Sequence, residues 1–404
     1  MMNTNPVTAG PVAGVDTHSE THTLAVLTAQ GAVEFTEEFT TDQRGHAALL
    51  TRLHEVEGLA AVGVEGTNSY GAELARTLLA QGFSVLEVLR PTRQVRRMDG
   101  KSDPIDAIAA ARQVLTGDGT SIPKHTGSPV EALRYLLVAR RNLIGAASRM
   151  ITVIKSLLVT APETVREPLR SLTTPTLIDT LAASRPGTML TDPAAAAKHT
   201  MRLLARDYQR LHAEADQLED QMTQLVTAIN PGMLEVYGSG TVTSAQLLVT
   251  AGDNSDRITT EAKFAHLCGA SPIPASSGKT HRYRLNRGGD RQANSALHRI
   301  ALVRMRHDPR TRAYVERRRA ENLSKKDILR CLKRAIAREI HHVLLHRTTP
   351  ERTDLRALRT QKQITLTDAA EALKTKPARL SEIERRTRPQ PALTTRYEKW
   401  LTAA

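Results

Sequence analysis

Cysteines and aromatic residues are scarce in this chain. Its 404 residues include two cysteines, Cys268 and Cys331, which lie far apart and have no metal-ligand spacing around them. We therefore expect neither a disulfide framework nor a zinc finger. Aromatic residues make up 3% of the chain, so the sequence shows no stacking platform for single-stranded nucleic acid.

Long apolar runs are also absent. No stretch approaches the roughly 18 uninterrupted apolar residues of a membrane span, and the N-terminus lacks the basic and apolar segments of a signal peptide. We expect a cytoplasmic protein with no membrane partner. The hydrophobic content of 40% is enough for two or three domains, each with its own core.

Positive charge is unevenly distributed along the chain. The net charge is +14, yet residues 1–280 carry 25 Lys/Arg against 29 Asp/Glu. Residues 281–350 carry 19 against 6, and residues 351–404 carry 12 against 7. A surface that merely aids solubility does not need this asymmetry, so we expect a polyanionic partner for the last third of the chain.

The N-terminal part alternates short strand-like runs with amphipathic segments. Three β-rich runs between Val12 and Thr36 predict an antiparallel meander, and a helix over Asp42–Glu57 follows. Next come a strand that ends on Glu65, a helix near Tyr70–Ala80, a strand over Ser84–Leu89 and a helix that opens near Asp103. The order βββαβαβα is that of the ribonuclease-H-like fold, so we predict such an α/β domain over residues 10–127.

Three further regions follow. The pattern of residues 128–230 predicts a helical or coiled-coil linker. Its second helix is expected to have an apolar seam at Leu211, Leu218, Met222 and Leu225. Residues 231–350 predict a mainly α-helical domain, in which Gly238-Ser-Gly240 resembles the turn of a helix-hairpin-helix, although a plain helix-start turn fits equally well. Residues 351–404 predict a separate unit of three helices, the second of them capped by Thr367.

Four carboxylates stand at positions typical of a metal site. Asp16 and Glu65 each end a predicted strand, where adjacent strands bring side chains together. Asp103 and Asp106 are three residues apart in the first turn of a helix and share a face. Four carboxylates can hold two divalent cations for phosphodiester chemistry, and Mg²⁺ or Mn²⁺ suits an all-oxygen site. Asp103 taken alone also fits a simple helix-capping role.

These motifs carry a family resemblance. The segments Gly14-Val-Asp16-Thr-His, Val64-Glu65-Gly-Thr-Asn-Ser-Tyr-Gly71 and Lys101-Ser-Asp103-Pro-Ile-Asp106-Ala resemble the catalytic motifs of DEDD transposases of the insertion-sequence one-ten family. The resemblance covers about residues 10–346. It implies a Holliday-junction-resolvase-like N-terminal domain, a transposase that cuts and rejoins DNA, and a location at the nucleoid.

A serine motif follows in the basic region. Ala275-Ser-Ser277-Gly278 resembles the family motif whose serine forms a covalent link to DNA, so the resemblance implies Ser277 as nucleophile, with Ser276 as the alternative. Without the resemblance this stretch reads as a flexible turn. The arginines beyond it are expected to clamp phosphates. They are Arg282, Arg284, Arg287, Arg291, Arg299, Arg304 and Arg306.

The C-terminal unit departs from the family pattern. Residues 355–386 resemble a phage-repressor-type helix-turn-helix, whereas the typical family member ends before this point. The resemblance also implies a guide non-coding RNA and dimers that assemble into a tetramer on DNA. Two alternative hypotheses remain open: a junction-resolvase-like nuclease that only hydrolyses DNA, and a non-enzymatic DNA-binding regulator.

Overall fold

A computed structural model describes residues 10–89, 102–125, 127–187, 189–276, 283–346, 355–384 and 390–403. The chain separates into two units. One consists of Met1–Glu131 together with Ala251–Thr259, and the other of Ala132–Thr250 together with Thr260–Ala404. A short segment from late in the sequence is therefore part of the N-terminal unit.

The N-terminal unit is built on a mixed sheet of six strands in the order β3-β2-β1-β4-β5-β6. The first three strands form the predicted antiparallel meander, while β4 runs parallel to β1 and β5 runs parallel to β4. The short β6 pairs antiparallel with β5 and was not predicted. The strands are β1 (Val12–Thr17), β2 (Thr21–Leu27), β3 (Val33–Thr40), β4 (Ala61–Glu65), β5 (Val85–Val88) and β6 (Thr120–Ser121).

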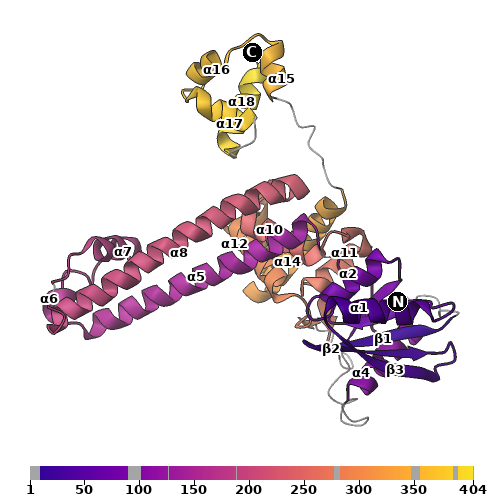
Figure 1. Cartoon of the computed structure of the whole chain (residues 1–404). Coiled ribbons are helices and arrows are strands. Elements are labelled where there is room, and N and C mark those ends of the chain that lie inside the picture. Colours follow the sequence, from indigo (N-terminus) through magenta and orange to yellow (C-terminus); the bar gives the residue numbers. More distant parts are fainter. Residues whose placement is uncertain are drawn as a thin grey trace. The chain divides into compact units, whose positions relative to one another are not determined.

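Helices cover both faces of this sheet (Figure 1). Helices α1 (Gln43–His54) and α2 (Ala72–Ala80) pack on the face that carries Val15 and Val64, and α4 (Asp103–Thr116) packs on the opposite face. Alternate residues of β1 and β4 point to opposite sides, so both faces of these central strands are apolar and buried. The predicted element order βββαβαβα is confirmed.

Glycines let α4 approach the sheet closely. Gly14 of β1 and Gly63 of β4 are register partners. A Cβ atom on Gly14 would lie 2.1 Å from the backbone nitrogen of Ala111, and one on Gly63 would lie 2.4 Å from a methyl group of Val114. The helix backbone therefore occupies the space that side chains would fill, which brings the first turn of α4 toward the ends of β1 and β4.

The segment 251–259 holds a loop of the N-terminal unit. The side chain of Asn254 accepts a hydrogen bond from the backbone nitrogen of His125 (3.1 Å) and donates one to the carbonyl of Pro123 (3.0 Å). Ser128 also donates a hydrogen bond to the carboxylate of Asp253. Three hydrogen-bonding groups between positions 123 and 128 are thus fixed by residues that follow them by more than a hundred positions.

Two long antiparallel helices form a hairpin, α5 (Pro129–Thr160) and α8 (Pro193–Ile229), whose tip holds α6 (Glu163–Arg166) and α7 (Thr174–Ala183) (Figure 1). The predicted seam of α8 is partly correct. Leu211 and Met222 are buried, but Leu218 and Leu225 are only half-buried, and Ala215 and Val226 are buried as well. The small Ala215 side chain contributes little hydrophobicity to a sequence pattern, so the seam is hard to place from sequence.

Helix α5 is the one described helix that is long and apolar enough to cross a membrane by length and composition, with a mean hydropathy of 1.5 over an 18-residue stretch. This criterion alone is weak, because core helices of soluble proteins also meet it. The buried apolar residues of α5 are separated by three, four, seven or ten residues, as on one face of a helix. They are Val130, Leu133, Leu137, Ala147, Ile154 and Leu158.

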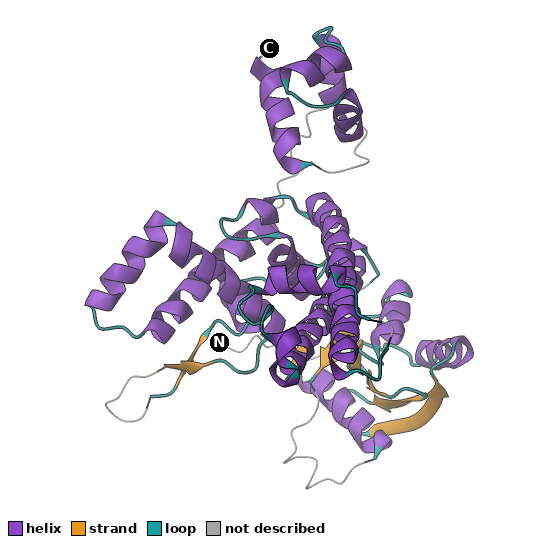
Figure 2. Cartoon of the chain, turned by 90° about the vertical axis from the view of Figure 1, so that its left-hand side faces the viewer, coloured by secondary structure: helices purple, strands orange, loops and turns teal. Residues whose placement is uncertain are grey.

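The next part of the second unit is mainly helical, as predicted (Figure 2). Ion pairs join its helices: Arg334 with Glu261, and Arg304 with Glu339 at 2.8 Å. A two-stranded sheet of β7 and β8 interrupts the helices. The elements are α9 (Gly232–Glu235), α10 (Thr241–Ala251), α11 (Glu261–Leu267), β7 (Pro272–Pro274), β8 (Tyr283–Leu285), α12 (Arg291–His307), α13 (Pro309–Ala320) and α14 (Lys325–Leu345).

The C-terminal residues form a small helical group with its own core. Its helices are α15 (Leu355–Gln361), α16 (Leu366–Ala372), α17 (Pro377–Glu384) and α18 (Pro391–Ala403). The predicted cap at Thr367 is wrong, because Thr365 caps α16 in a capping box with Asp368. The fourth helix was not predicted, yet its Tyr397 is fully buried and donates a hydrogen bond to Glu384.

Replacing Gly14 by alanine is expected to push α4 away from β1, because the added methyl group meets helix backbone that cannot rotate aside. We expect the free energy of unfolding to fall by about 1–3 kcal/mol, the usual range for overpacking. Chemical denaturation of the full chain measures this loss. Gly145→Ala is the matched control, since only the flexible end of Arg149 lies near that position, at 3.8 Å. An equal effect of the two substitutions would contradict the close packing.

Candidate functional site: a carboxylate cluster and a basic hairpin

Two of the predicted carboxylates end neighbouring parallel strands. The pairing of Val15 with Val64 places Asp16 beside Glu65 at the carboxyl ends of β1 and β4. Both acids follow the glycines of their strands by two residues, so they point to the same face as Gly14 and Gly63, toward α4. Asp16 is 2% exposed and Glu65 is 7% exposed. Two acids so deeply buried at one sheet edge require a compensating positive charge.

The other two carboxylates lie in the first turn of α4. Ser102 precedes the helix, and Pro104 occupies one of its first positions, where a missing N–H group costs nothing. Asp106 is 5% exposed, whereas the Asp103 side chain is 41% exposed. Asp103 therefore lies on the solvent-exposed side of the site, and Asp106 lies on its buried side.

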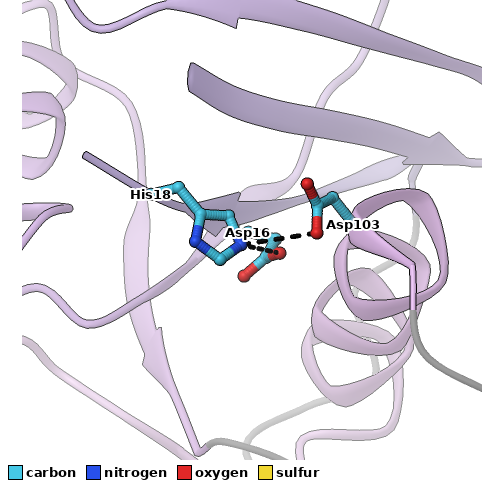
Figure 3. A group of neighbouring side chains, drawn as sticks. All are labelled: Asp16, His18 and Asp103. Atoms are coloured by element: carbon cyan, nitrogen blue, oxygen red, sulfur yellow. Dashed lines mark hydrogen bonds and ion pairs between the residues drawn. The ribbon is translucent and has the colours of Figure 1, made fainter. Parts of the chain in front are cut away.

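His18 joins two of these acids (Figure 3). Its Nε2 atom lies 3.2 Å from Oδ2 of Asp16 and 3.4 Å from Oδ1 of Asp103. One ligand atom from each of the three residues lies within 4.8 Å of the others. Reasoning from sequence missed His18, although the Asp-x-His spacing at a strand end places both side chains on one face.

The electrostatics of Asp16 reflect this crowding. Burial raises its pKa, and the carboxylates of Glu65, Asp106 and Asp103 raise it further, while His18 opposes the rise. The three other predicted acids thus all act on Asp16, although among the described residues only Asp16 and Asp103 fall within the compact group with His18. A cation among these acids relieves their mutual repulsion.

The predicted serine motif leads away from β7. Ser276 is exposed and follows the end of β7 by two residues, whereas Ser277 and Arg282 lie outside the described residues. The segment that leads from α11 to β7 is held by a side chain of α12. The Asn294 side chain donates hydrogen bonds to the carbonyls of Cys268 and Gly269, both at 2.9 Å, and accepts one from the Lys333 ammonium at 2.9 Å.

The predicted phosphate-clamping arginines divide into two groups. Arg304 is engaged inside the protein, since its guanidinium binds both oxygens of Glu339 and the carbonyl of Tyr237. It is therefore unsuited to the clamping role that we expected from sequence. Arg284 and Arg287 line an open hollow of about 850 Å³ together with Arg330. All described arginines of the predicted set other than Arg304 are exposed: Arg284, Arg287, Arg291, Arg299 and Arg306.

The fold and the site define a class of protein: an α/β domain with acids converging at one sheet edge, followed by an arginine-rich helical region. Two protein-family models match parts of this chain. Residues 13–161 match the DEDD model of the IS110 kind, described as Transposase, and residues 233–316 match the Transposase IS116/IS110/IS902 family. Together the matches span more than half of the chain and support a DNA transposase or recombinase enzyme.

A curated relative agrees with these matches. The insertion element IS110 uncharacterized 43.6 kDa protein of Streptomyces coelicolor is 36% identical over 120 residues. The shared stretch is 29% of this chain and 29% of the relative. The similarity to this relative therefore concerns less than a third of either protein.

A buried histidine pair lies close to the carboxylate site. His22 is the register partner of Thr17 at the end of β1 and is 1% exposed. Its ring stacks on that of His46, with ring centroids 5.4 Å apart. Burial lowers the pKa of His22 to about 4, and the neighbouring His46 and His18 lower it as well.

This pair predicts a loss of stability in mild acid. An unfolded histidine has a pKa near 6.5, so below this value the unfolded chain takes up a proton that folded His22 refuses until about pH 4. The contribution is fully present above pH 6.5 and falls by about 1.4 kcal/mol for each pH unit below it. Hydrogen exchange of the β1 and β2 amides between pH 8 and pH 5 measures this loss. The H22L variant is the control, and parallel pH profiles of the two proteins would refute the role of His22.

Proposed function

We propose that this chain is the transposase of a bacterial insertion sequence and cuts and rejoins DNA by serine attack on a phosphodiester. The observation that carries the proposal is the convergence of Asp16 and Asp103 at one edge of the sheet. Glu65 and Asp106 are buried beside them and act on the charge of Asp16. A purely DNA-binding regulator has no use for so many buried acids.

The donor set suits a divalent metal ion, which we infer to be Mg²⁺ or Mn²⁺. Asp16, Glu65, Asp103 and Asp106 would supply the carboxylate oxygens that these ions prefer, and the imidazole of His18 offers one nitrogen as an additional ligand. When bound, such an ion makes an attacking oxygen more acidic and stabilises the leaving oxygen. The buried Asp16 would hold the ion from the sheet side, and the more exposed Asp103 would hold it from the solvent side.

Ser277 is the proposed nucleophile, with Ser276 as the alternative. The serine hydroxyl loses its proton as its Oγ–phosphorus bond forms, and one ester bond between phosphorus and a deoxyribose oxygen breaks. That leaving oxygen gains a proton and becomes a free hydroxyl. Because the number of phosphoester bonds is unchanged, the strand can be rejoined to a new partner without an external energy source.

Further features of the proposal follow from the family resemblance. The order of the first five strands supports a ribonuclease-H-like assignment of residues 10–127. The partners are DNA at the element ends and target, a guide RNA, and further copies of the chain in a dimer that assembles into a tetramer. We place the protein in the cytoplasm at the nucleoid. Helices α16 and α17 are the proposed helix-turn-helix pair of the C-terminal unit.

A second candidate function is a resolvase-like nuclease. The carboxylate cluster favours it, because the same acids serve a reaction in which water attacks the phosphodiester. The exposed β7–β8 region with its arginines favours the recombinase instead, since a hydrolase needs no serine loop. The two functions differ in one product, a covalent link between protein and DNA.

Isosteric replacement of the acids tests the metal site. Asp16→Asn, Glu65→Gln and Asp106→Asn each keep the size of the side chain but remove its charge. We expect strand cleavage of an element-end duplex with Mg²⁺ to fall at least about a hundredfold. Loss of a residue that only orients a metal ligand already costs up to that factor, and these acids are proposed as the ligands themselves. Glu38→Gln, at an exposed position of β3, is the control and should cleave normally. Normal cleavage by all three site variants would remove the metal-site proposal.

Capture of a covalent intermediate separates the recombinase from the nuclease. Quenching the reaction with denaturant and digesting the protein should leave a peptide with Ala275–Lys279 that carries a nucleotide, detected by mass spectrometry. Ser277→Ala should eliminate the adduct and retain DNA binding, since the arginines remain. An adduct on Ser276 would reassign the residue and keep the mechanism. DNA cleavage at the element ends without any adduct would establish water as nucleophile and favour the resolvase.

A further inference from the structure

Helices α5, α10 and α12 of the second unit surround a small pocket of about 150 Å³. At roughly 30 Å³ for each water molecule, this space holds about five waters, which is comparable to the five non-hydrogen atoms of a phosphate group. The first turns of α10 and α12 contribute Thr243 and Gln292 to its lining. Helix N-termini carry partial positive charge, so the pocket favours an anion even before side chains are considered.

Three arginines line the pocket, Arg140, Arg141 and Arg299, and no carboxylate lines it with them. Ser295 and Gln292 add neutral hydrogen-bonding groups. Neither Arg141 nor Arg299 has an ion-pair partner among the described residues. Unpaired arginines gathered around a phosphate-sized space are the usual arrangement for binding a phosphate group.

Arg140 is the most informative member of the group. It lies between Leu137 and Ile144 on the pocket side of α5 and is 19% exposed. One terminal nitrogen lies 2.6 Å from a carboxylate oxygen of Glu219 on α8, which fixes the side chain across the hairpin. Its Nε atom is buried and has no hydrogen-bond partner in the described part of the chain. A buried donor without a partner is energetically unfavourable.

We propose that this pocket binds a backbone phosphate of duplex DNA. The inference rests on the proposed function, which requires the chain to hold DNA, and it adds the helical hairpin to the DNA-binding surface. Arg299 was among the arginines expected from sequence, whereas Arg140 and Arg141 precede that set by more than a hundred residues. The first turn of α10, which follows Gly238-Ser-Gly240, contributes Val242 and Thr243 to the lining of the pocket.

The test compares paired variants of the full chain. Arg141→Gln removes a lining charge, and Arg149→Gln removes an exposed arginine two turns further along α5, outside the pocket. Ser295→Asp places a negative charge in the pocket, and Ser295→Ala removes the hydroxyl alone. Binding of a fluorescent element-end duplex is measured by anisotropy in EDTA at several salt concentrations. EDTA prevents cleavage, so binding is scored independently of catalysis.

We expect Arg141→Gln to weaken duplex binding about tenfold and to reduce the slope of log affinity against log salt by about 0.9, the value for one lost phosphate contact. Ser295→Asp should weaken binding at least as much. Arg149→Gln and Ser295→Ala should remain within about twofold of the parent, and equal melting temperatures verify that all variants fold.

Three other outcomes would overturn the inference. Equal affinities and salt slopes for Arg141→Gln and Arg149→Gln would show that the pocket holds no phosphate of the duplex. An RNA hairpin of matched length serves as a second probe, and a loss confined to it would replace DNA by RNA as the occupant. If the parent chain itself fails to bind the duplex, the proposed function fails, and the inference fails with it.

Discussion

The close contact between α4 and the two central strands governs the N-terminal unit. Gly14 and Gly63 lack side chains where the helix crosses the sheet, so the helix backbone packs directly on Gly14 and the side chain of Val114 packs directly on Gly63. Two residues further along each strand, Asp16 and Glu65 face the same helix. The glycines thus set the distance at which the first turn of α4 meets the strand ends. A helix held further out by side chains would carry Asp103 and Asp106 away from the other two acids.

This packing concentrates negative charge in a region with little water. Burial and three neighbouring carboxylates raise the pKa of Asp16, and the imidazole of His18 opposes them from the open side. Such a site stores unfavourable electrostatic energy that a divalent cation or a protonated group relieves. The fold itself therefore places Asp16 where its negative charge is unfavourable unless a positive charge or a proton compensates it.

The positive charge of the chain is organised differently. Some arginines stabilise the protein, as Arg304 does with Glu339 and Arg334 does with Glu261. Others have no acidic partner among the described residues and face open space, as Arg141 and Arg299 do around the small pocket. Residue type alone does not separate these roles, because both groups consist of arginines on amphipathic helices.

The sequence by itself determined the order of elements in the N-terminal unit and the strand-end positions of Asp16 and Glu65, because alternation and helical periodicity are local properties. It also predicted that α4 opens at Asp103. Only the tertiary structure decided that His18 lies between Asp16 and Asp103 and that Arg304 forms an ion pair with Glu339. The same holds for Asn254, which packs with the N-terminal unit. Each of these depends on partners distant in the sequence or on side-chain direction, which no local pattern records.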